Sequence, residues 1–285
     1  MNSQNENITS VNALFTNAVE AGNLSPISAN IFNSAKDIGT QIQAALGTPV
    51  DQIPATDMFL VSLLLDDSGS IRWLSGEDPD HPGKTISGED LIIWAHNMIL
   101  EDILKESKHK ANIMLMSQLL NGRIINPFTL ASDAKKLDHN NYSADGGTPL
   151  YDMSIKFMGA VRAKELEFRD AAVPVKTVSL ILTDGHDEHS HQHGARDVAQ
   201  VVKEMLTTSE DHIIAAMGFN DGRTPFKQIF QDMGIDDKWT FTPQNRPREI
   251  GKALRLFSQS VSAASKNAQS FSKIQEEGAA GGFGA

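Results

Sequence analysis

The chain has no cysteine among its 285 residues, and this absence excludes several kinds of chemistry. Disulfides, thiol catalysis, zinc–thiolate sites and iron–sulfur clusters all require cysteine. Aromatic residues are also sparse, at 6%, although 40% of the residues are hydrophobic, so aliphatic side chains must supply most of the core. This length and composition suffice for one large domain with an appendage, or for two small domains.

The sequence also has too little positive charge to suggest a nucleic-acid-binding surface. Its formal net charge is -11, whereas binding to a duplex draws most of its affinity from Lys and Arg. The first ten residues lack the basic-then-apolar pattern of a signal peptide, and no apolar run is long enough to span a membrane. We therefore expect a cytoplasmic protein that binds neither nucleic acid nor membrane.

Three apolar runs indicate buried strands. They lack polar alternation, which is typical of parallel strands covered on both faces. An Asn-Gly pair at 121–122 separates two further apolar runs, and such a pair is the strongest short hairpin signal. The predicted strands cover residues 58–65, 112–120, 123–128, 177–183 and 213–219, with a short one at 239–242.

Amphipathic helices are predicted between these strands. They cover residues 87–105, 148–166, 196–206, 226–233 and 247–264. A long polar connection is expected at 71–87, and an irregular polar segment at 131–147. Strands that alternate with helices predict a single α/β domain, which we place over residues 55–264. We expect three layers around a doubly wound, mostly parallel sheet with one antiparallel edge strand.

Both ends of the chain lie outside this alternating pattern. Residues 1–50 predict a helical hairpin extension, because Gly22-Asn23 interrupts an amphipathic stripe and Ser25-Pro26 is typical of a helix start. The hairpin is expected to pack on the main domain, with a partner-docking or oligomerisation arm as the alternative. Residues 265–285 are expected to form a flexible, glycine-rich tail.

Oxygen ligands follow two of the buried strands. Asp66, Ser68 and Ser70 come directly after residues 58–65, Asp184 follows residues 177–183, and Thr148 opens the helix before that strand. The carboxyl ends of neighbouring parallel strands form a ligand crevice, and hard divalent cations prefer oxygen ligands. The alternative is that the two aspartates cap strand ends and bind turn amides.

These residues resemble the metal-ion-dependent adhesion site of von Willebrand factor A domains. The resemblance rests on the order of elements over residues 55–264 and on three motifs: Asp66-x-Ser68-x-Ser70, Gly146-Gly147-Thr148-Pro149-Leu150 and Leu182-Thr183-Asp184-Gly185. The second motif and the glycine-rich tail are most similar to bacterial intracellular members, such as the tellurite-resistance TerY-like group.

The resemblance implies a ligand set and a function. Mg²⁺, or Mn²⁺ or Ca²⁺, would be held directly by Ser68 and Ser70, directly or through waters by Asp66 and Asp184, and by Thr148 in one conformational state. The family implies a protein-interaction module, not an enzyme, that captures an Asp or Glu of a partner within a bacterial stress-response or defence complex. A metal-dependent hydrolase and a self-assembling structural component are the alternatives, and the oligomeric state stays open.

A histidine-rich loop follows Asp184. His189, His191 and His193 stand at alternate positions and could bind Zn²⁺ or Ni²⁺ as a second metal site. They could also form a pH-sensitive rim, or belong to a solvated loop beside the crevice. Asp67 lies next to the first motif, and we expect it at the surface.

Overall fold

A six-stranded mixed sheet forms the centre of the molecule. The computed structural model describes residues 3–34, 38–53, 57–106, 112–208, 212–219, 222–244 and 246–266. The strand order is β5-β4-β1-β6-β7-β8, and every pair except β4–β5 is parallel. The strands are β1 Met58–Leu65, β4 Ile113–Leu119, β5 Ile124–Leu130, β6 Val175–Thr183, β7 His212–Gly218 and β8 Thr240–Phe241. The predicted fold class is confirmed.

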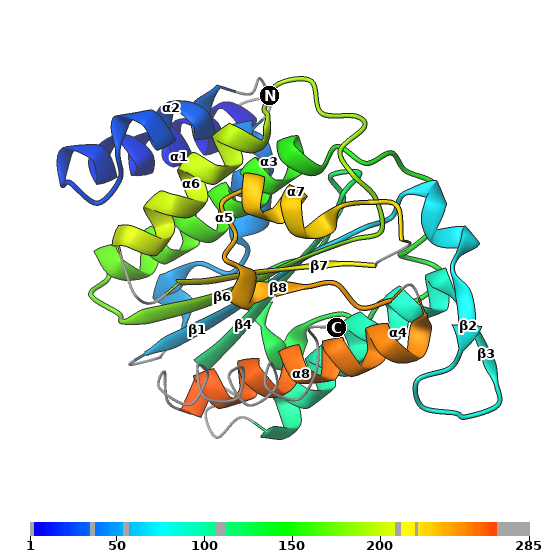
Figure 1. The fold of residues 1–285 in the computed structure, drawn as a ribbon. Coiled ribbons are helices and arrows are strands. Elements are labelled where there is room, and N and C mark those ends of the chain that lie inside the picture. The colour runs from blue at the N-terminus through cyan, green and yellow to red at the C-terminus, as the bar shows by residue number, and fades with distance from the viewer. Residues whose placement is uncertain are drawn as a thin grey trace.

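Helices cover both faces of this sheet, as Figure 1 shows. One face carries α4 Gly88–Glu106 and α8 Pro247–Lys266; the other carries α5 Leu150–Asp170, α6 Ala195–Thr208 and α7 Phe226–Asp232. Each helix was predicted, with boundaries that shift by a few residues. Because β1 is covered on both sides, all eight of its residues are buried, as its uninterrupted apolar run predicted. Within the described residues, no helix is long and apolar enough to cross a membrane.

The N-terminal extension differs from the predicted two-helix hairpin. It contains three helices, α1 Ser3–Glu20, α2 Pro26–Asn33 and α3 Ile38–Leu46. Ser25 caps α2 as expected, but that helix ends after Asn33 and does not run on to residue 46. The Ser34 hydroxyl donates to the Ile31 carbonyl oxygen, and such local bonds compete with the helical ladder. Residues 35–37 and the predicted tail beyond residue 266 lie outside the described residues.

The extension shares the core of the main domain. Phe15 and Phe32 are fully buried and stack with ring centroids 5.1 Å apart. Lys164 of α5, also fully buried, donates to the Thr48 carbonyl oxygen at 2.6 Å. The three helices lie on the same side of the sheet as α5 and α6 (Figure 1). The expectation that the extension packs on the main domain is therefore met.

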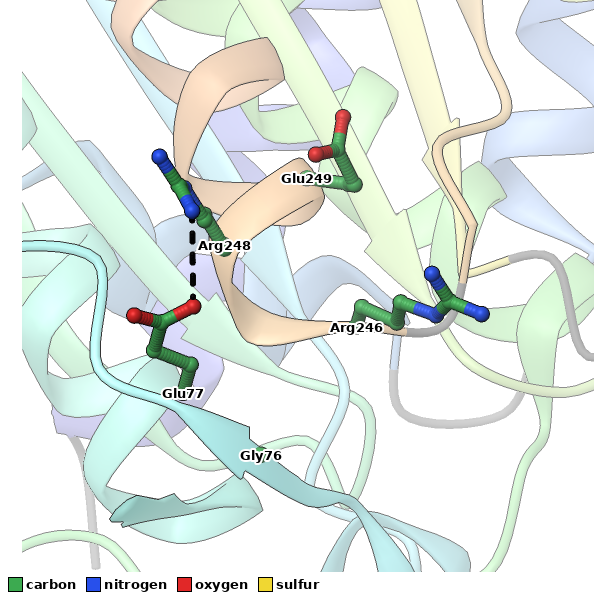
Figure 2. Close-up of a pocket in the computed structure, with 5 residues that line it drawn as sticks. All are labelled: Gly76, Glu77, Arg246, Arg248 and Glu249. Atoms are coloured by element: carbon green, nitrogen blue, oxygen red, sulfur yellow. Dashed lines mark hydrogen bonds and ion pairs between the residues drawn. The ribbon is translucent and has the colours of Figure 1, made fainter. Parts of the chain in front are cut away.

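A small hairpin occupies the polar connection predicted at residues 71–87. Strands β2 Ser75–Glu77 and β3 Thr85–Ser87 pair in antiparallel fashion. Each has three residues and most are exposed, so no apolar alternation marks them in the sequence. Glu77 of β2 and Arg248 of α8 form an ion pair at 3.5 Å and line a cleft of about 300 Å³ between the hairpin and that helix. Arg246, which also lines the cleft, points away from this pair (Figure 2). A short 3₁₀ turn, η2 Gly69–Trp73, precedes the hairpin.

Candidate metal centre

The candidate site lies where β1 and β6 end side by side. The two strands pair in parallel from Met58 with Val175 to Leu65 with Leu182. The amide of Asp66 continues this ladder by donating to the Leu182 carbonyl oxygen at 3.0 Å. The loops after the two strands therefore begin at the same edge of the sheet, as the sequence predicted.

Three side-chain oxygens from these loops form a compact triangle. The Ser68 and Ser70 hydroxyl oxygens lie 2.9 Å apart. Both hydroxyls donate to Oδ1 of Asp184, at 3.2 Å from Ser68 and 2.8 Å from Ser70. Ser68 is buried and Ser70 is exposed, so the triangle opens to solvent on the Ser70 side.

Asp66 occupies the position behind this triangle. Its Oδ1 accepts from the Ser68 amide at 2.7 Å, and its Oδ2 accepts from the Thr183 hydroxyl at 2.7 Å and the Asp184 amide at 3.1 Å. The residue is fully buried. Asp66 thus fixes both loops relative to each other. The suggestion that the aspartates bind turn amides applies to Asp66, whereas Asp184 accepts from the two serine hydroxyls.

Thr148 approaches the same cluster from a third loop. The Gly146 amide donates to the Asp67 carbonyl oxygen at 2.8 Å, and the Gly69 amide donates back to Gly146 at 3.1 Å. The Thr148 hydroxyl oxygen lies 3.8 Å from where a Cβ on Gly185 would sit. The structure therefore brings all five predicted residues to one place. Thr148 reaches it beside Gly185, outside the hydrogen-bonded triangle.

The electrostatics of the site favour binding of a cation. Burial, followed by repulsion from Asp66, raises the pKa of Asp184 to about 7. A carboxylate held near another carboxylate in a desolvated loop is stabilised by a cation. Two neutral hydroxyls and one carboxylate are also the hard oxygen donors that Mg²⁺ and Mn²⁺ accept.

The spacing of the triangle also fits an octahedral ion. Mg²⁺ binds oxygen at about 2.1 Å, so neighbouring ligand oxygens lie about 3 Å apart. The three distances between Ser68, Ser70 and Asp184, 2.9, 3.2 and 2.8 Å, agree with that spacing. The residues present therefore fit a divalent cation.

Asp67 corrects one expectation from the sequence. It is fully buried rather than at the surface. Its Oδ1 accepts from the Asn121 amide at 3.0 Å, and burial raises its pKa to about 7. The apolar pattern of β1 contains no information on which way the next side chain turns. Asp67 instead ties the turn of the β4–β5 hairpin to the first motif.

Tyr142 is a supporting residue that the sequence did not reveal. Its hydroxyl donates to the Asp66 carbonyl oxygen at 2.8 Å, and the residue is 2% exposed. Burial raises the pKa of the tyrosine above its usual value, so the hydroxyl stays a donor. Tyr142 lies within the segment predicted as irregular, where no periodicity marks a buried position.

The three histidines of the following loop have separate roles. His189 Nδ1 accepts from the Thr148 amide at 2.9 Å. His193 contacts Asp152 of α5 at 3.1 Å and the Ser34 hydroxyl at 2.9 Å. His191 uses its backbone amide to bind Asp152. Among the residues with defined positions, no group of three His, Cys, Asp or Glu is placed to hold a metal. The structure thus does not bring these imidazoles together as a second metal site.

Comparison with known proteins gives a structural similarity only. No protein-family profile matches the chain, and no curated protein matches it either. Among solved structures, the chain is similar to a von Willebrand factor type A from Catenulispora acidiphila, with 15% identity and a TM-score of 0.43. The similarity covers 73% of this chain and 43% of that one, so the chain spans less than half the length of that protein.

Proposed function

We propose that this chain is a divalent-cation-dependent protein-binding module of the von Willebrand factor A type. Ser68, Ser70 and Asp184 would hold Mg²⁺ or Mn²⁺ directly, Asp66 would position them, and Thr148 would contribute from the third loop. The observation that carries the proposal is the oxygen triangle, whose edges of 2.8 to 3.2 Å match neighbouring ligands of one octahedral ion.

The ligand set explains why a partner would be recruited. Two of the three triangle oxygens are neutral hydroxyls, so the first shell carries little negative charge. The bound cation would supply a positive centre that a carboxylate from another protein completes, and charge-assisted contacts of this kind are among the stronger polar interactions. Ser70 is exposed, which gives such a carboxylate access from solvent.

We infer binding in preference to catalysis. His189, whose Nδ1 accepts from the Thr148 amide, uses this nitrogen to orient a loop. The partner would belong to a bacterial stress-response or defence assembly in the cytoplasm. Its surface around the carboxylate would be neutral or basic, because the chain has a net charge of -11 and its loops at 71–87 and 185–195 carry acidic residues.

A capture experiment tests the proposed function. The tagged chain is incubated with cell lysate in Mg²⁺, in EDTA, and as the Asp184→Ala variant, and bound proteins are compared by mass spectrometry. The expected result is a set of partners that returns only with the wild-type chain in Mg²⁺. Asp51→Asn is the matched control, because Asp51 is an exposed carboxylate outside the loops that border the site, and it should retain the set. Recovery of the same proteins under all conditions would contradict the bridging cation.

A further inference from the structure

Trp73 leaves an unusually large apolar side chain in solvent. It is 89% exposed, and Ile27 is the other exposed large hydrophobic residue among those described. A single exposed apolar residue needs no special explanation. Tryptophan, however, is enriched where proteins bind one another, because it supplies a large contact area with a polar tip. The exposure of Trp73 suggests an interaction surface because the residue lies close to the candidate metal centre.

Trp73 shares one side of a 3₁₀ turn with the exposed metal ligand. Ser70 and Trp73 are the second and fifth residues of η2 Gly69–Trp73. Side chains three residues apart eclipse in a 3₁₀ helix, and the rise of about 2 Å per residue puts their Cα atoms about 6 Å apart. Both residues are exposed, whereas Ile71 and Leu74 are buried. The turn therefore presents its indole and its ligand hydroxyl together.

The turn is held firmly from beneath. Ile71 is fully buried, and its carbonyl oxygen approaches Gly88 at the start of α4 so closely that a Cβ there would lie 1.9 Å away. Arg72, the next residue of the turn, pairs with Glu89 of α4 at 3.4 Å. An exposed anchor that is already positioned before binding loses less freedom on association.

The hairpin that follows the turn is fixed as well. The indole of Trp94 donates to Asp80 at 2.6 Å. Arg255 of α8 pairs with the same carboxylate and lies over the Trp94 ring, 5.1 Å from its centroid. The hairpin tip at Pro79 packs so closely on Gly251 that a Cβ there would lie 2.7 Å from it. The chain thus uses one tryptophan to brace the hairpin and leaves Trp73 without such packing.

We propose that Trp73 and the cation site form one continuous docking surface for a segment of another protein. That segment carries a carboxylate for the cation and, within three residues of it, a bulky apolar side chain for the indole. The limit of three residues follows from the separation of about 6 Å between the Cα atoms of Ser70 and Trp73. The proposal rests on the proposed function. A protein segment fits better than an anionic membrane, because the chain has a net charge of -11.

A displayed peptide library tests the proposal. Peptides of seven residues, with Asp fixed at the centre and all other positions random, are selected on the immobilised full chain in Mg²⁺ and eluted with EDTA. We expect the eluted peptides to be enriched in Leu, Ile, Met, Phe or Trp within three positions of the Asp. Their affinity, measured by fluorescence polarisation, should fall about 30-fold in Trp73→Ala, as for an interface hot spot, and far less in Trp73→Phe.

The control and the contrary outcomes separate this proposal from the proposed function. Ile27→Ala, which truncates the other exposed apolar residue, should leave affinity unchanged. Peptides that elute with EDTA but lack apolar enrichment, or bind Trp73→Ala equally well, would overturn the role of Trp73 and leave the cation-dependent capture intact. No EDTA-eluted peptide at all would overturn both. Dimerisation of the chain in sedimentation velocity that Trp73→Ala abolishes would make a second copy the occupant, and would also overturn the proposal.

Discussion

At the scale of single residues, the two carboxylates of the site have different roles. Asp66 accepts three hydrogen bonds from Ser68, Thr183 and Asp184 and is fully buried. Asp184 accepts from the two serine hydroxyls and is only partly exposed. These contacts suit Asp66 to positioning the two loops, and they leave Asp184 as the carboxylate that we propose as a direct ligand.

Substitution by asparagine should separate these roles. Asp66→Asn would turn one acceptor into a donor that faces other donors, so we expect the free energy of unfolding in EDTA to fall by about 2 kcal/mol. Asp184→Asn should abolish cation binding and leave the free energy of unfolding in EDTA unchanged or higher, because it removes repulsion with Asp66. Urea denaturation in EDTA measures both effects. Equal losses of stability in the two variants would contradict the division of roles.

His96 should give the folded protein a pH dependence. Its Nδ1 lies 3.1 Å from Asn97 Oδ1 and its Nε2 lies 3.2 Å from the Ser117 hydroxyl, which also accepts from Asn126. Burial lowers the pKa of this imidazole from 6.5 to about 4. The folded protein keeps His96 neutral where the unfolded chain protonates it, so stability is complete above pH 6.5 and falls between pH 6.5 and pH 4, by about 3 kcal/mol in all.

Denaturation over this pH range checks the prediction. His96→Gln should flatten the loss of stability between pH 6.5 and pH 4, because glutamine does not titrate. Asn17→Ala is the control, since it removes a non-titrating side chain at an exposed position of α1 and should retain the full loss of stability. If His96→Gln loses the same amount of stability between pH 6.5 and pH 4, other groups cause the pH dependence.

At the scale of elements, the η2 turn links the candidate metal centre to the helix layer. Gly88 opens α4 directly beneath it, and the approach of the Ile71 carbonyl leaves no room for a Cβ. Gly88→Ala should lower the free energy of unfolding by about 2 kcal/mol through overpacking. It should also weaken cation binding, because the turn carries Ser70.

The matched control lies in the same turn. A Cβ on Gly69 would meet nothing within 4 Å, so Gly69→Ala should change neither stability nor cation affinity. Thermal unfolding and Mg²⁺ titration of both variants measure the difference. Equal behaviour of the two alanine variants would show that the turn is not held by its contact with α4.

The sequence predicted some elements well for physical reasons. The apolar runs at β1 and β6 are long enough to identify buried parallel strands, and the Asn-Gly pair at 121–122 identified the β4–β5 hairpin. The convergence of the five candidate residues could be predicted because each follows or opens such an element. The β2–β3 hairpin could not, since most of its residues are exposed and it is held by tertiary contacts such as that of Trp94 with Asp80. The end of α2 at Asn33 could not either, since no Gly or Pro marks it in the sequence.

At the scale of the whole molecule, the N-terminal helices belong to the core. Arg162 and Lys164 of α5 are buried beneath them and bind the carbonyl oxygens of Asn23 and Thr48. Glu204 of α6 binds Ser25 and Ser28 of the extension. A detachable arm would not satisfy buried charges of the main domain in this way, because unpaired buried charges are strongly destabilising.

Phe15→Ala should therefore destabilise the entire protein. The side chain is fully buried against Phe32, and a phenylalanine truncated in a core costs about 3–5 kcal/mol. Calorimetry should show one transition at a lower temperature, since the extension and the sheet share one core. Asn17→Ala, at an exposed position of the same helix, should have little effect. A separate low-temperature transition in Phe15→Ala, with the main one unchanged, would identify residues 1–50 as an independent arm.

The proposed function requires that one divalent cation binds at the oxygen triangle. Titration of the chain with Mn²⁺, with free ion counted by electron paramagnetic resonance, tests this directly. We predict one bound Mn²⁺ per chain, displaced by Mg²⁺, lost in Asp184→Ala and Ser68→Ala, and retained in Asp51→Asn. Mn²⁺ binding of equal affinity in wild type and Asp184→Ala, or no binding to the wild-type chain, would contradict the proposed function.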